Sequence, residues 1–211
     1  MEPADRASEL RRFWFGTQPL TAARLDERIR YWFAGREPQE VQRQRDEELR
    51  ARFEPLVGEA ARGQLASWAG SPRRRLALIL LLDQLPRNLF RATPRAFATD
   101  AEALALALSG IQSGADAALG PVERIFFYMP LQHAESAEAQ EESLAAYRRL
   151  LAEAPEALRP VFESTLRAAE THREIIHRFG RFPHRNRILG RASAPDEQGY
   201  LASGRASFGQ S

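Results

Sequence analysis

The pattern of apolar and polar positions predicts helices along almost the whole chain. Apolar residues recur at intervals of three and four, which places them on one face of an α-helix. No stretch alternates apolar and polar residues at period two, so no strand is predicted. We therefore expect an all-α protein of seven to nine helices joined by short loops. The positions that carry this pattern include Leu25, Ile29 and Trp32; Leu104, Leu108 and Ile111; Leu144, Tyr147 and Leu151; and Leu158, Phe162 and Leu166.

Residues with capping or breaking properties mark several helix ends. Thr99 or Asp100 can cap a helix that starts at Ala101, and Ser136 can cap the helix that follows it, because their side-chain oxygens accept from free N–H groups. Pro121 suits the first turn of a helix. Four glycines are expected to stop helices, namely Gly35, Gly70, Gly114 and Gly180.

The chain of 211 residues is long enough to bury a core without disulfides or a structural metal. No linker rich in Pro, Ser or Gly divides it, so we expect one helical domain over residues 1–211. A last short helix is expected to start within Ser193–Glu197, and residues 203–211 are expected to be loosely ordered. The aromatic triplets at 13–15 and 31–33 have unlike flanks, so they indicate no repeat.

Composition excludes several kinds of chemistry. The chain has no cysteine, and all 30 of its basic residues are arginine. Thiolate nucleophiles, zinc fingers, iron–sulfur clusters, lysine Schiff bases and the lysine of a phosphate-binding P-loop are thereby excluded, and no cofactor is expected. With 28 acidic residues the net charge is only +2. Nucleic-acid binding through Arg73–Arg75 or Arg181–Arg191 is therefore the least favoured function.

Neither a secretory signal nor a membrane span is predicted. The first residues, Met1–Arg12, mix acids and arginines without the apolar segment of a signal peptide. The longest strongly apolar run, Leu76–Leu82, is far shorter than the roughly 20 residues that a spanning helix requires. We expect a buried helix at this run and a cytoplasmic protein.

The first of four polar segments is Leu81–Arg91, which follows the apolar run directly. Pro86 is expected to disrupt or kink the helix, which could aim its polar side chains into a cavity. Asp83 alone is better explained as a buried carboxylate paired with Arg87 and without a ligand, since carboxylates are seldom buried unpaired. The polar side chains fall in two adjacent helical rows, with Asp83, Arg87 and Arg91 in one and Gln84 and Asn88 in the other.

The second polar segment, Arg95–Asp100, leads into a helix. Free N–H groups at a helix start and the guanidinium of Arg95 could together receive an anion. Asp100 itself is more simply explained as a cap of that helix.

The third polar segment is Tyr128–Glu135. Pro130 is expected to end or bend the helix and to leave His133 and Glu135 on a turn where they project together. This His-x-Glu spacing lacks the other ligands of zinc deaminases and metalloproteases, so no metal is expected. A pair that moves a proton or orients a ligand explains this spacing at least as well as a metal site does.

The fourth polar segment is Glu170–Arg191. Glu170, Arg173 and His177 would share one helix face, and the loop after them mixes arginine, histidine and aromatic side chains. Loops on a rigid scaffold often carry function. An exposed basic loop anchored by its phenylalanines explains the same residues equally well.

These motifs resemble those of a bacterial family known as domain of unknown function 924. The resemblance implies an all-helical fold similar to tetratricopeptide-repeat superhelices, a right-handed array of helices. It implies no activity, because the family has no established reaction. Relatives have His-Ser-Glu where this chain has His133-Ala134-Glu135, so no catalytic serine is expected there. The matching stretches occur in order at Phe13–Gly16, Trp32–Phe33, Leu65 with Trp68, Leu82–Arg91, Arg95–Asp100, Tyr128–Glu135, Phe179–Asn186 and Leu189–Arg191.

We expect the four polar segments to converge on one pocket for a small anionic ligand. Arg87 must then lie within about 15 Å of His133 or His184, the span of a cavity for a small molecule. The expected contacts of the ligand are Asp83, Gln84, Arg87, Asn88, Arg91, Arg95, Tyr128, Arg181, Arg185 and Asn186. Any proton transfer would fall to His133, Glu135, His177 or His184.

The alternative is a non-catalytic module that holds a peptide or partner protein in a helical groove. Trp14 and Trp32 would be exposed aromatic anchors of such a groove, unless they belong to the core. A closed pocket favours the ligand, and an open apolar groove favours the module. The sequence names no reaction, ligand or oligomeric state.

Overall fold

The computed structural model describes residues 3–17, 22–33 and 38–203, and this part of the chain folds into helices without a strand. The all-α prediction is therefore confirmed. The α-helices are α1 (Pro3–Phe15), α2 (Ala22–Trp32), α3 (Gln39–Ala61), α4 (Pro72–Ile79), α5 (Leu85–Leu89), α6 (Asp100–Gln112), α7 (Pro121–His133), α8 (Ala137–Ala152), α9 (Arg159–Phe179) and α10 (Pro195–Ala202). Short 3₁₀ turns lie at Ala66–Gly70, Pro94–Phe97, Asp116–Ala118, Glu156–Leu158 and Pro183–Arg185.

Two of the α-helices belong to one continuous rod. α4 passes through a π turn at Leu80–Gln84 into α5 while the backbone keeps helical angles at both junctions. Counted in this way, the described ranges hold nine helices, which agrees with the seven to nine expected. The apolar run Leu76–Leu82 lies in this rod, where no side chain of the run is more than 4% exposed. None of the helices that the structure describes is long and apolar enough to cross a membrane.

Several predicted helix boundaries are confirmed. The Ser136 hydroxyl accepts a hydrogen bond of 3.3 Å from a first-turn N–H of α8, and Pro121 is the first residue of α7. Gly180 ends α9 with a φ of 70°, a left-handed conformation that favours glycine. Gly35 and residues 204–211, the greater part of the expected tail, lie outside the described residues.

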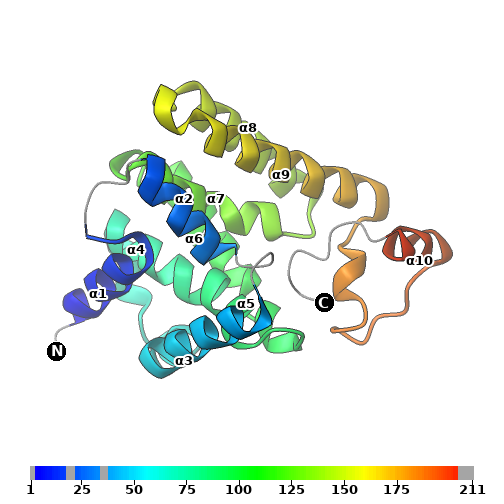
Figure 1. The fold of residues 1–211 in the computed structure, drawn as a ribbon, viewed down its shortest axis with the longest axis horizontal. Coiled ribbons are helices and arrows are strands. Elements are labelled where there is room, and N and C mark those ends of the chain that lie inside the picture. The colour runs from blue at the N-terminus through cyan, green and yellow to red at the C-terminus, as the bar shows by residue number, and fades with distance from the viewer. Residues whose placement is uncertain (1–2, 18–21, 34–37, 204–211) are drawn as a thin grey trace.

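Helices α8 and α9 form a long antiparallel hairpin along one side of the molecule (Figure 1). α9 buries Phe162, Ala169, His172 and Ile176, whose separations of seven, three and four place them on one helical face. The opposite face carries charged side chains. The amphipathic pattern in the sequence is therefore the reason that α9 packs along its length.

The main core is rich in aromatic side chains. Phe126 is fully buried, and its ring meets the rings of Trp14, Phe15 and Trp32 edge to face, at centroid distances of 5.7, 5.4 and 4.7 Å. Such pairs add to the stabilisation that burial provides. Trp14 and Trp32 are only 1% and 7% exposed, so they belong to the core and are not exposed anchors of a groove.

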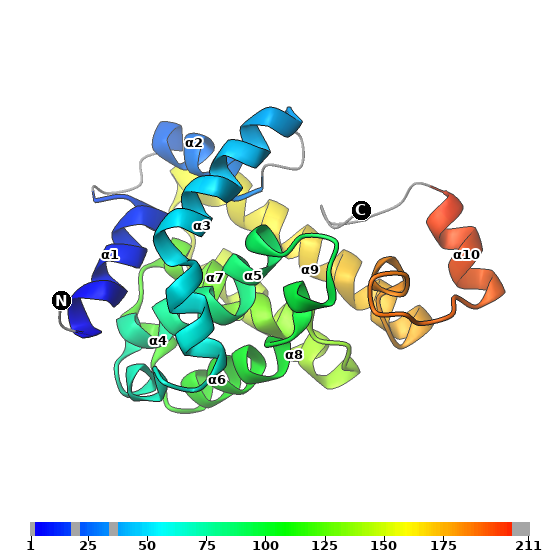
Figure 2. The ribbon, with the colours of Figure 1, turned by 90° about the horizontal axis from the view of Figure 1, so that it is seen from below.

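Residues 180–203, here named the C-terminal lobe, meet the rest of the described chain, here named the body, in a small apolar cluster. Ile175 and Ile176 at the end of α9 pack with Phe182 of the lobe, and this cluster is separate from the main apolar core of the body. α10 begins at Pro195, inside the range predicted for the last helix. Two views at right angles both show α10 to one side of the body (Figures 1 and 2). The lobe therefore lies against one end of the body.

Candidate functional site

A π turn sets the register of the first polar segment. Pro86 has no N–H, so the carbonyl of Leu82 loses its usual backbone donor, and it accepts the hydroxyl of Thr99 at 2.6 Å instead. The N–H of Leu85 bonds the carbonyl of Leu80, five residues back, which is the spacing of a π turn. Pro86 therefore widens one turn without ending the rod. Such turns are frequent at functional sites.

Asp83, in this π turn, is a fully buried carboxylate with partners on both oxygens. Its Oδ2 accepts from Gln84 Nε2 at 2.5 Å, and its Oδ1 lies 2.7 Å from His133 Nδ1 and 3.1 Å from Arg87 Nη1. Burial alone would raise the pKa of Asp83, but the charge of Arg87 and the hydrogen bonds outweigh it and hold the pKa below its usual range. Asp83 is therefore ionised at neutral pH.

His133 is the last residue of α7, which runs through Pro130. Of the two expected effects of Pro130, ending the helix is therefore wrong, and a bend stays a prediction. Gln140, fully buried in α8, closes the helix end by donating from Nε2 to the carbonyls of Gln132 at 2.8 Å and Ala134 at 2.9 Å. A glutamine side chain thus replaces the backbone donors that a helix end lacks, and it fixes the turn that carries His133.

The two nitrogens of the His133 ring have different surroundings. Because Asp83 is a carboxylate, Nδ1 must be the N–H donor in the bond between them, which leaves the lone pair on Nε2. Nε2 makes no hydrogen bond to any residue that the structure describes, and the side chain is 14% exposed. Burial and the charge of Arg87 lower the pKa of His133, so the ring is neutral at pH 7.

Asp100 joins two arginines that lie far apart in the sequence. Arg87 donates to both of its oxygens, at 2.8 and 2.9 Å, and Arg185 donates to Oδ2 at 3.1 Å. The Asp100 side chain makes no capping bond at the start of α6, so the capping interpretation is wrong. Arg87 and His133 contact the same oxygen of Asp83, which meets the 15 Å condition stated for a single pocket.

Arg185, from the C-terminal lobe, lies over two phenylalanine rings. Its guanidinium carbon is 4.6 Å from the ring centroids of both Phe97 and Phe182. Its Nη2 donates to the carbonyl of His133 at 2.9 Å, whereas its buried Nε has no acceptor in the described part of the chain. Burial and repulsion by Arg87 lower the pKa of Arg185 to about 10.

Two further histidines lie beside this arginine. The His172 ring is 6.1 Å from that of His133 and 5.5 Å from Phe182, and its Nδ1 donates to the carbonyl of Ala168 at 2.7 Å. Burial and the neighbouring His133 lower the pKa of His172 to about 3. Burial and Arg185 likewise lower the pKa of His184 to about 3. Both rings are therefore uncharged at neutral pH.

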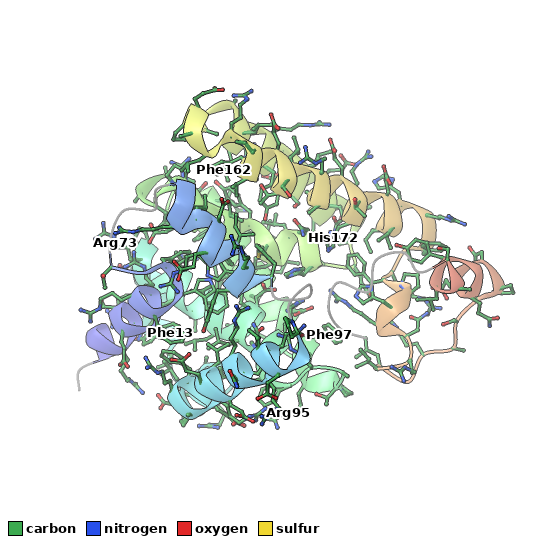
Figure 3. The ribbon with its side chains drawn as sticks, in the orientation of Figure 1. Phe13, Arg73, Arg95, Phe97, Phe162 and His172 are labelled. Atoms are coloured by element: carbon green, nitrogen blue, oxygen red, sulfur yellow. The ribbon has the colours of Figure 1, made fainter. Side chains whose placement is uncertain are left out.

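The position of this cluster can be followed in the side-chain view. Phe97 and His172 lie on the side of the body that faces the C-terminal lobe, whereas Phe13, Arg73 and Phe162 lie toward the other end (Figure 3). Asp83, Asp100 and His133 come from the body, and Arg185 and His184 come from the lobe. We name these residues with Arg87, Phe97, His172 and Phe182 the junction site.

Glu135 does not pair with His133 as expected. It accepts from the N–H of Phe182 at 2.8 Å and from both Nη atoms of Arg191, at 2.6 and 2.9 Å. Burial would raise the pKa of Glu135, but Arg191 and the backbone N–H outweigh it and lower the pKa. Glu135 therefore acts as an anchor of the lobe on the body, beside the junction site.

Most other predicted contacts have protein partners. Arg91 donates to Asp46 at 2.7 Å and to Asn88 at 2.6 Å. Arg181 makes two hydrogen bonds to the buried Glu197, at 2.7 and 2.8 Å. Asn186, also buried, donates to the same glutamate at 3.1 Å. The pKa of Glu197 falls to about 2 because of Arg181 and these hydrogen bonds, against the opposing effect of burial. Arg181 and Asn186 thus hold the lobe together internally.

Three predicted residues lie apart from the junction site. The guanidinium carbon of Arg95 stacks 3.7 Å from the ring centroid of Phe90. Tyr128 donates to Asp116 at 2.6 Å. His177 lies on the exposed side of α9, where its Nε2 is 3.0 Å from Glu141. Arg173 binds the same glutamate, so this part of the fourth segment joins the two helices of the hairpin.

Some residues of the junction site were not predicted. His172 lies at the apolar spacing of α9, so the pattern places it on the buried face but does not indicate its partners. Gln140 and Phe97 give no signal in the sequence beyond their residue type. Asp100 and Arg185 are separated by 85 positions, and no local pattern relates them.

A cavity of about 370 Å³ lies between α6 and the start of α8, and no residue of the junction site lines it. The described residues contain no group of three or more His, Cys, Asp or Glu side chains placed to hold a metal ion. The cavity is lined by Leu104, Leu108, Ile111, Gln112, Ser136, Glu138, Ala139 and Glu142.

Comparison with known proteins places the chain among proteins without an assigned activity. Residues 10–205 match the model of a family described as "Bacterial protein of unknown function (DUF924)". The solved structure of a protein of unknown function, ATU0120 from Agrobacterium tumefaciens, is similar over 96% of this chain and 99% of that chain, with 36% identity and a TM-score of 0.75. No curated protein matches. The functional argument therefore rests on the site.

Proposed function

Because the chain belongs to the DUF924 family of bacterial proteins, whose description names no activity, we propose a function from the junction site. The protein binds a small anionic ligand there, and Arg185 is the principal contact of the anion. Arg87 supports the binding from the body, and the neutral histidines offer further hydrogen bonds.

One observation carries the proposal, the incompletely compensated charge of the buried Arg185. Its side chain is 8% exposed, and it shares the single carboxylate of Asp100 with Arg87. Its Nε has no acceptor in the described part of the chain. A buried donor without a partner destabilises the protein, and an anion at Nε would remove that cost.

The electrostatic surroundings support the same assignment. Burial is the main cause of the lowered pKa values of Arg185 and His184, and positive charge adds to it: Arg87 lowers the pKa of Arg185, and Arg185 lowers that of His184. A negative charge nearby stabilises the protonated, charged form of such a group. Arg91 and Arg181 each have a carboxylate partner of their own, so we assign the anion to Arg185 and not to them.

The rings beside Arg185 favour a ligand over a purely structural role. The guanidinium carbon lies 4.6 Å from the ring centroids of Phe97 and Phe182, and a guanidinium that stacks on aromatic rings keeps its N–H groups for hydrogen bonding. Binding sites for small molecules combine apolar walls with a few placed polar groups. The alternative, a module that holds a peptide, loses one of its two supports, because Trp14 and Trp32 are both buried.

A thermal-shift screen against phosphorylated and carboxylated metabolites tests the proposal. A ligand present at 100 times its dissociation constant adds about 2.7 kcal/mol to the free energy of unfolding, which raises the melting temperature by several degrees. We expect such a shift in the native protein and its loss in Arg185→Gln. Arg187→Gln is the matched control, because Arg187 is an exposed arginine two positions away.

Two outcomes would contradict the proposal. One is the absence of a shift with every phosphorylated and carboxylated compound. The other is a shift of equal size in Arg185→Gln and in the native protein, since the anion would then bind elsewhere.

A further inference from the structure

The pairing of His133 with the buried Asp83 is not needed for anion binding, yet its geometry is that of an oriented base. We propose that His133 is a general base that removes a proton from a hydroxyl group of the bound anion, and that Asp83 is its positioning residue. The substrate class is then a small anion that carries a hydroxyl group. This inference rests on the proposed function for the anion, but the base itself can be tested without a ligand.

The hydrogen bond between Asp83 and His133 decides which nitrogen can accept a proton. The bond of 2.7 Å joins the carboxylate to Nδ1, and a carboxylate can only accept. The proton of the neutral ring is therefore on Nδ1, and Nε2 has the lone pair. A base held in this way by a third group is the arrangement found in hydrolytic triads.

Asp83 is itself fixed, so the ring cannot turn freely. Gln84 holds its second oxygen at 2.5 Å, and Arg87 lies 3.1 Å from the oxygen that His133 uses. Gln140 closes the helix end that carries His133. A buried carboxylate with this many partners keeps one position, and a pre-set ring orientation is what general-base catalysis requires.

The exposure of the pair fits a base and not only a structural contact. Asp83 is fully buried behind the ring, whereas the His133 side chain is 14% exposed. Nε2 makes no hydrogen bond to the described part of the chain. A histidine with a purely structural role has both ring nitrogens engaged or buried. Here one nitrogen is anchored and the other is open to a ligand.

The other histidines fit this role less well. His172 is 5% exposed, and its pKa of about 3 makes its ring a much weaker base than an ordinary imidazole. His184 has a similarly low pKa. His177 lies on the outer face of the hairpin, bonded to Glu141. His133 differs from these three in that a fully buried carboxylate orients its ring through Nδ1.

The proton step balances without a further reactant. The O–H bond of the ligand breaks, its proton forms an N–H bond with Nε2, and the oxygen keeps the electron pair. The ring becomes an imidazolium, whose charge the Asp83 carboxylate stabilises. Arg87 opposes that charge, so the proton is readily returned when the step reverses or when product leaves.

Diethyl pyrocarbonate tests the state of His133 directly. A neutral imidazole nitrogen attacks a carbonyl carbon of the reagent, an ethyl carbonate leaves, and the modified ring loses its other proton to solvent. The chain suits this reagent because it has four histidines and neither lysine nor cysteine. Peptide mass spectrometry then gives a separate rate for each histidine, with the exposed His177 as internal reference.

We expect His133 to react through Nε2 and to keep its rate in mild acid. A histidine with the ordinary pKa of about 6.5 loses about eightfold in rate between pH 7 and pH 5.5, and His133 should lose less, because burial and Arg87 lower its pKa. In Asp83→Asn the ring is no longer held by a carboxylate, so the rate at His133 should change while that at His177 does not. Failure of His133 to react in the native protein would overturn the proposal.

Asp83→Asn could fail to fold, so a measurement on the native protein accompanies it. A long-range ¹H–¹⁵N spectrum at pH 7 reports which nitrogen of each histidine is protonated. We expect protonated Nδ1 and unprotonated Nε2 for His133. The opposite tautomer, or a charged ring, would overturn the base.

A matched pair of anions tests the hydroxyl group. Glycerol 3-phosphate and propyl phosphate differ only in hydroxyl groups, so the first should bind more tightly to the native protein and lose that advantage in His133→Gln. Equal binding to the native protein would overturn the substrate class. If Arg185→Gln binds both as the native protein does, the anion assignment fails, while the reagent and the tautomer still decide the base.

Discussion

The body and the C-terminal lobe are stabilised by different forces. In the body, Phe126 alone packs against four aromatic rings, among them that of Trp32, and all of these contacts are apolar. The lobe contributes Phe182 to a small apolar cluster with Ile175 and Ile176 of the body, and it is also joined to the body by hydrogen bonds and ion pairs of Arg185, Arg191 and the N–H of Phe182. Apolar packing is not directional, whereas these bonds require fixed geometry.

Because of this difference, the polar side chains of the junction site lie at the boundary between the two regions. A body with a large apolar core can tolerate buried charged groups at one end. A lobe attached by polar groups can supply Arg185 and still separate locally at modest cost in free energy. The junction site thus combines rigid groups from the body with groups that can move.

The largest effect is expected from a cavity in the body. Phe126→Ala should lower the free energy of unfolding by about 4 kcal/mol, because the fully buried ring is lost and its neighbours cannot close the space. Urea denaturation measures this change. A loss below about 1 kcal/mol would mean that the body is not built on this aromatic core.

The next largest effect is expected at the buried carboxylate of the junction site. Asp83→Asn should lower the free energy of unfolding by about 3 kcal/mol, since it leaves Arg87 and His133 without their shared buried carboxylate. Urea denaturation of Asp83→Asn, compared with that of Phe126→Ala, measures this loss. An unchanged stability would show that the buried pair contributes nothing to the fold.

Mild acid should destabilise the protein through its buried histidines. The pKa of His172 is about 3 in the folded protein and about 6.5 when unfolded, so only the unfolded chain gains a proton as the pH falls below 6.5. The free energy of unfolding then falls by about 1.4 kcal/mol per pH unit for this group. Between pH 6.5 and pH 5, His172→Gln should lose about 2 kcal/mol less than the native protein.

The control for this prediction is His177→Gln, which alters an exposed histidine on the same helix. Its urea denaturation should show the native dependence on pH. A His172→Gln variant with the same pH dependence as the native protein would contradict the buried, neutral state of His172.

The smallest effect is expected at the attachment of the lobe. Glu135→Gln keeps the shape of the side chain but removes the charge that binds Arg191, and the pair is 25% exposed on both sides, so we expect a loss of only about 1 kcal/mol. Hydrogen exchange should nevertheless rise at the N–H of Phe182 and through the lobe while the body stays protected. Uniform exchange throughout the chain would contradict the division into two regions.

Local spacing predicted more of the fold than of the junction site. The apolar intervals of α9, the cap at Ser136 and the position of Arg87 beside Asp83 all depend on residues within one or two helical turns. Pro130 and Asp100 were misread because tertiary partners decide their roles.

The contacts that make the junction site connect distant parts of the chain. Asp83 and His133 are 50 positions apart, and Arg185 and Asp100 are 85 apart. Their pairing follows from the packing of the π turn at Leu80–Gln84, α6, α7 and the lobe. A sequence pattern can name such residues as polar and unusual, but only the packed structure brings them together.

The central claim is that Arg185 binds an anion, and its side-chain N–H reports this directly. In a ¹H–¹⁵N spectrum the Nε signal of Arg185 is identified by its absence in Arg185→Gln, and the native protein is then titrated with orthophosphate and with acetate. The account predicts a saturable shift of this signal with at least one of them, larger than that of the exposed Arg187. A shift of Arg185 no larger than that of Arg187 with both anions would contradict it.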